Sequence, residues 1–87
     1  MLFHVSYQVS PERRSTAQDR FKETGGLPPT EVTIRGRWHS VSGLAGFTLV
    51  EASDPQAIAK WLQDWTDILT FEVTPVLTDE QFAQVIG

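Results

Sequence analysis

Hydrophobic and polar residues alternate in four stretches of the chain, and this pattern predicts four β-strands, each with one buried face. The clearest stretch is residues 2–9, where one face carries Phe3, Val5, Tyr7 and Val9 and the other carries His4, Ser6 and Gln8. The other strands are expected at residues 31–40, 46–52 and 68–77. The strand at 46–52 begins apolar on both faces, which is typical of a central position in a sheet. Pro75 indicates that the last strand lies at an edge.

Helical periods with recognisable start and stop signals lie between and after these strands. The first helix begins with Ser10 as its cap and Pro11 as its first helical residue, and it ends at the Gly25-Gly26 pair. Its inner stripe is short of large apolar residues and consists of Ala17, Phe21 and Thr24. The second helix begins at Asp54 and Pro55 and has the strongest period in the chain, Ile58, Trp61, Leu62 and Trp65. A capping box from Thr78 to Gln81 begins a short last helix that carries Phe82, Val85 and Ile86.

The resulting order of elements is β-α-β-β-α-β with a C-terminal helical tail at residues 78–87. Short chains with this order usually fold as an α+β ferredoxin-like sandwich, in which two helices cover one face of a four-stranded antiparallel sheet. No internal repeat or linker divides the chain, so residues 1–87 are expected to form one domain.

The second strand contains a feature that complicates the assignment of its faces. Regular alternation places Val32, Ile34 and Trp38 on one face and Thr33, Arg35, Arg37 and His39 on the other. Gly36 in the middle of the strand indicates a β-bulge or a close approach by another group. A bulge would exchange the two faces after Gly36, so the faces of Trp38 and His39 stay open.

Composition and charge narrow the classes of function. The chain has no cysteine, which excludes disulfides and thiolate metal sites and fits a cytoplasmic location. Residues 1–7 lack the pattern of a signal peptide, and no apolar run is long enough to cross a membrane. The net charge is −4, distributed as +2 over residues 1–37 and −6 over residues 38–87. This balance argues against nucleic acid as a partner, since binding to a phosphate backbone needs many cations.

Three stretches of the sequence together resemble the DUF3303 family of small bacterial proteins. They are Gly36-Arg37-Trp38-His39, the strand Gly46-Phe47-Thr48-Leu49-Val50-Glu51-Ala52, and Phe71-Glu72-Val73-Thr74-Pro75-Val76-Leu77. The resemblance runs from Met1 to about Leu77 and leaves the final helix outside. It implies the fold of the dimeric α/β barrels and a homodimer in which two sheets pack face to face. It implies no activity, because the family has none assigned.

The polar face of the sheet, away from the helices, has two interpretations. In one it is simply exposed to water, as antiparallel sheets allow. In the other a second copy covers it and leaves a polar chamber for a small organic ligand, which Arg35 and Arg37 could clamp if it is anionic. The residues expected to line this chamber are His4, Ser6, Arg35, Arg37, Trp38, His39 and Glu72.

The rival hypotheses differ in what these residues do. His39 beside Trp38 is a candidate general base of a cofactor-free monooxygenase or isomerase, because an unperturbed histidine titrates near neutral pH. A structural or regulatory dimer without a ligand is a third class. His4 and His39 with Glu72 or Glu51 could in principle hold a metal. Two histidines on separate strands are a weak metal signal, so no metal and no cofactor are expected, and polar packing or ion pairing is the alternative for each group.

Overall fold

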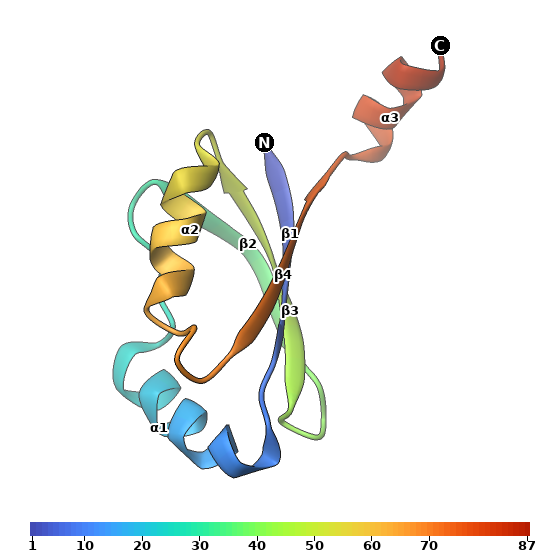
Figure 1. The fold of residues 1–87 in the computed structure, drawn as a ribbon. Coiled ribbons are helices and arrows are strands. Elements are labelled where there is room, and N and C mark those ends of the chain that lie inside the picture. The colour runs from blue at the N-terminus through green and yellow to red at the C-terminus, as the bar shows by residue number, and fades with distance from the viewer.

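The computed structural model describes all of residues 1–87, and it has the predicted order of elements (Figure 1). The strands are β1 (Leu2–Gln8), β2 (Val32–His39), β3 (Ala45–Ala52) and β4 (Thr70–Val76). The helices are α1 (Arg14–Thr24), α2 (Pro55–Gln63) and α3 (Asp79–Ile86), and a 3₁₀ turn, η1 (Pro11–Arg13), precedes α1. The strands form one antiparallel sheet in the order β2-β3-β1-β4, with α1 and α2 on the same face. The chain is therefore an α+β ferredoxin-like domain, and β3 is central and β4 is an edge strand as predicted.

Most helix ends follow the predicted signals. The Asp54 carboxylate accepts a hydrogen bond from the Gln56 backbone N–H at 2.9 Å, and the capping box at Thr78 forms both of its bonds. Gly25 ends α1 in the left-handed conformation, with a φ of 70°. Two expectations are wrong. Ser10 makes no side-chain cap bond, because a 3₁₀ turn begins there, and α2 stops at Gln63, so Trp65 lies in the following turn.

The hydrophobic core lies between the sheet and α2. The alternating inner residues of β1, β2 and β3 meet the apolar stripe of α2, so the eight residues of the core cluster are Phe3, Val5, Val32, Val50, Ala52, Ile58, Trp61 and Leu62. Val50 and Ile58 are the most deeply buried large side chains. This half of the domain is packed as the helical period of α2 predicts.

The other helix, α1, packs differently and has no buried residue. Its Arg20 guanidinium donates two hydrogen bonds of 2.8 Å to the Asp67 carboxylate and one of 2.7 Å to the Asp64 carbonyl oxygen. These bonds hold the pKa of the Asp67 carboxyl below its ordinary value of 3.8. A polar contact at the surface thus ties α1 to the turn after α2, while its inner stripe is too lean to fill the space above the sheet.

The β-bulge predicted at Gly36 is present and changes the faces of β2. Ile34 pairs with Val50 and Gly36 pairs with Leu49, so Arg35 is the extra residue. After the bulge, Arg37 pairs with Thr48 and His39 pairs with Gly46, and both side chains lie on the helix face of the sheet. Trp38 lies on the outer face over Gly36, where a β-carbon would collide with the indole ring.

Candidate functional site

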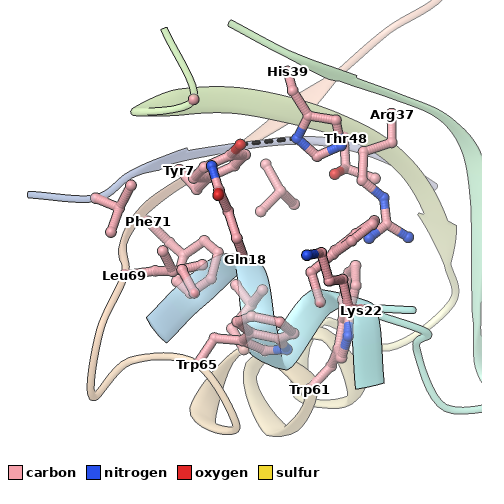
Figure 2. A pocket seen from close by; sticks show the side chains of 17 residues that line it. Tyr7, Gln18, Lys22, Arg37, His39, Thr48, Trp61, Trp65, Leu69 and Phe71 are labelled. Atoms are coloured by element: carbon pink, nitrogen blue, oxygen red, sulfur yellow. Dashed lines mark hydrogen bonds between the residues drawn. The ribbon is translucent and has the colours of Figure 1, made fainter. Parts of the chain in front are cut away.

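The space left between α1 and the sheet is a partly open cavity of about 320 Å³ (Figure 2). The inner face of the sheet forms one wall, α1 forms the opposite wall, and the end of α2 with its following turn forms a third. Ten of the 17 lining residues are hydrophobic, among them Phe21, Trp61 and Trp65. A mainly apolar cavity of this size with a few polar groups is the usual form of a small-molecule site.

The polar groups include a hydrogen-bonded pair that bridges two strands. The Tyr7 hydroxyl of β1 lies 2.8 Å from Nδ1 of His39 in β2, and Figure 2 draws this bond at the sheet side of the cavity. Burial raises the pKa of the Tyr7 phenol above 10.0, against a smaller opposite effect of Arg37. Tyr7 therefore keeps its proton near neutral pH. The Phe21 and His39 rings also meet in a T-shaped contact, with ring centres 5.6 Å apart.

Two cations reach the same cavity from opposite walls. Arg37 extends from the sheet toward α1, and its guanidinium lies 5.3 Å from the centre of the Phe21 ring (Figure 2). Lys22 comes from α1. Burial lowers the pKa of Arg37, which means that the charged form is partly removed from water there. The chain's two ion pairs, Arg20–Asp67 and Arg35–Glu51, leave Arg37 and Lys22 without a carboxylate partner.

The structure divides the seven predicted ligand-binding residues between two faces. Five lie on the outer face as expected, namely His4, Ser6, Arg35, Trp38 and Glu72. The placement of Arg37 and His39 on that face is wrong, because the bulge turns both toward the helices. His4 and His39 consequently lie on opposite faces and are not brought together, and no group of three metal-ligating side chains occurs in the structure.

The outer face of the sheet carries aromatic side chains as well as the polar ones that the sequence predicts. Phe47 lies between the His4 imidazole and the Trp38 indole, with ring centres 5.1 Å apart on each side and nearly parallel planes. Ser6 pairs with Phe47 on one side and with Glu72 on the other, which completes a row across the sheet. Arg35 binds Glu51 on the neighbouring strand, and this bond lowers the pKa of the Glu51 carboxyl.

Sequence reasoning missed several residues of the cavity. The alternation and helical period predict Tyr7 and Trp61 as part of a filled core. No sequence pattern points to Thr48, and Lys22 is predicted on the polar surface of the first helix. One available signal was the lean inner stripe of α1, which cannot fill a layer opposite a full-length sheet. A second was Tyr7 itself, since it places a hydroxyl on a strand face that is otherwise apolar.

Fold and cavity together define a ferredoxin-like α+β domain with an internal, mainly apolar site. The whole chain, residues 1–87, matches the model of DUF3303, a domain of unknown function, and the protein belongs to this family. The match includes α3, which the sequence resemblance had left outside. No curated protein matches the chain.

The fold also occurs among solved structures. One of them is an uncharacterized NIPSNAP domain protein from Burkholderia xenovorans, which is 12% identical to this chain with a TM-score of 0.50. The alignment covers 91% of this chain and 97% of that chain. At this identity the likeness concerns the fold alone.

None of the helices of this protein is long and apolar enough to cross a membrane.

Proposed function

We propose that this protein is a homodimeric binding protein for a small organic molecule, and that the molecule occupies the cavity under α1. The observation that carries the proposal is the cavity itself, which is mainly apolar, partly open to solvent and bordered by a few convergent polar groups. This position replaces the chamber between two sheets that the sequence suggested, because Arg37 and His39 both face the helices.

The test is a titration with a neutral apolar fluorophore, N-phenyl-1-naphthylamine, which should bind the wild-type protein in a saturable way. Ala17→Phe places a ring in the cavity from α1 and should abolish saturable binding. Ala59→Phe makes the same change at an exposed position of α2 and should bind the dye as wild type does. Equal binding by both variants, with unchanged circular dichroism, would place the dye elsewhere and refute the cavity as the site.

The dimer rests on the amount of surface that one copy exposes. The chain has an accessible surface of 6105 Å² and only 12 of 87 residues are buried. A compact monomer of 9.8 kDa exposes about 5,200 Å² on the general scaling of area with mass. The excess of about 900 Å² is close to the roughly 800 Å² that each partner buries in a standard interface.

Two exposed apolar surfaces suit a second copy. One is the outer-face row around Trp38 and Phe47, which are 53% and 40% exposed. The other is α3, which projects beyond the sheet and away from α1 and α2 with Phe82, Val85 and Ile86 exposed (Figure 1). In a symmetric dimer each α3 can cover the partner's outer face, so that α3 and the outer face of both subunits are buried.

Catalysis is a second candidate function, and the Tyr7–His39 hydrogen bond favours it. A histidine held by a partly buried phenol at the wall of an apolar cavity has the arrangement of an oriented general base. The reaction class that needs only these groups is a proton transfer within a bound substrate, as in an isomerase. For any compound found to be converted, His39→Gln should lower kcat at least about 100-fold. A kcat that stays unchanged would remove His39 from the mechanism.

A further inference from the structure

The charges around the cavity are one-sided. Among its 17 lining residues are two permanent cations, Arg37 and Lys22, and no aspartate or glutamate. The whole chain has the opposite balance, with 11 acidic and 7 basic residues. A cavity that gathers cations without acids, in an acidic protein, has a local field that favours an anion.

Two residues that line the cavity, Arg37 and Trp61, have hydrogen-bond donors without a side-chain acceptor. The Trp61 side chain is only 7% exposed, and its indole N–H has no partner. Arg37 is partly buried and has a phenyl ring but no carboxylate beside its guanidinium. A buried donor without a partner is costly. A carboxylate placed against Arg37 would supply the acceptor that its guanidinium lacks.

The remaining lining determines the rest of the molecule. Apolar and aromatic side chains from both helices and the sheet border most of the cavity, so the ligand has an apolar body. A planar carboxylate matches the fork of one guanidinium bidentately, and one negative charge balances the partly buried cation of Arg37. The volume of about 320 Å³ lies at the lower end of ligand pockets and limits the body to a small aromatic or aliphatic group.

We infer, on the basis of the proposed function, that the cavity under α1 binds small apolar monocarboxylates, with the carboxylate on Arg37 and the apolar body between Phe21, Trp61 and Trp65. Lys22 adds a second positive charge at the α1 wall. The Tyr7–His39 pair closes the sheet side of the head-group region.

The inference is tested with a matched pair of probes, 4-phenylbutyrate and its neutral amide, by calorimetric titration near neutral pH. The wild-type protein should bind the acid about 10- to 100-fold more tightly than the amide, since hydrogen bonds to charged groups contribute more than neutral ones. Arg37→Gln should remove this preference while the amide still binds. Arg35→Gln is the matched control, because it changes the same residue type on the same strand but on the outer face, and it should keep the preference.

The outcomes separate the two proposals. Equal affinity for acid and amide in a wild-type protein that binds the neutral fluorophore would overturn the carboxylate and leave the cavity as a binding site. No binding of either probe would also overturn it, and the fluorophore then decides whether the cavity binds anything. If Arg37→Gln does not fold, Lys22→Gln at the α1 wall of the cavity replaces it and should weaken acid binding without affecting the amide. An unchanged preference in that variant would count against the cationic head-group site.

Discussion

A chain from which Arg35 is deleted should fold normally, whereas a chain from which Ser6 is deleted should not. Removing one residue from a strand usually moves every following side chain to the wrong face. Arg35 is the extra residue of the bulge in β2, so its removal leaves Ile34 and Gly36 as consecutive partners of Val50 and Leu49. Arg37 and His39 then still face the cavity. The only interaction lost is the exposed ion pair with Glu51.

Ser6 lies in the regular central strand β1, which pairs on both sides without a bulge. Its deletion must turn either Phe3 and Val5 or Tyr7 and Val9 away from the core. Urea unfolding followed by circular dichroism should show a cooperative transition near the wild-type midpoint for the Arg35 deletion and none for the Ser6 deletion. An unfolded Arg35 deletion would show that the bulge itself is required for the fold.

Val85→Glu should convert the proposed dimer into monomers, with at least a 10-fold rise in the dissociation constant. The helix α3 shows its apolar face to solvent, and a carboxylate in the middle of that face would have to be buried in the interface without a partner. Gln84→Glu adds the same charge to the opposite face of the same helix and should leave the dimer intact. Light scattering over micromolar concentrations measures both variants against a monomer mass of 9.8 kDa.

Several outcomes would contradict this role of α3. A monomeric wild-type protein at micromolar concentration would refute the dimer altogether. A dimer that Val85→Glu leaves intact, but that Trp38→Ala weakens, would keep the outer face as the interface without α3. A membrane surface is a poor alternative partner for α3, because the helix has two acidic residues in its first turn and no lysine or arginine.

The sequence could predict most of the fold because local patterns and tertiary packing agree in most elements. The alternation in β1 and the period of α2 gave the correct buried faces, and the capping box at Thr78 formed as expected. The buried face expected for β4 is wrong in part, because Phe71 packs against the core but Val73 is 43% exposed at the sheet edge. The weaker α1 gave a correct helix but a wrong expectation of packing. Phe21 was expected in the core, and it is 40% exposed at the wall of a cavity.

The candidate site could be predicted only in part, and β2 shows why. Arg37 and His39 were correctly singled out as chemically important, and Gly36 was recognised as a place for a bulge. Whether the strand bulges depends on its pairing with β3, where Gly36 and Leu49 are partners and Trp38 lies on Phe47. That pairing joins residues far apart in the chain, so a single strand's sequence does not contain it.

By itself the sequence determined the order of elements, the ferredoxin-like class and the buried faces of the regular elements, because these follow from the fixed periods of strands and helices. The tertiary structure alone decided that Arg37 and His39 face α1 rather than the outer surface. It also decided that a cavity exists there, because a cavity is the volume that side chains from several elements together fail to fill. Arg20 and Asp67 hold α1 at its edge, while its inner stripe is too small to fill the space beneath it.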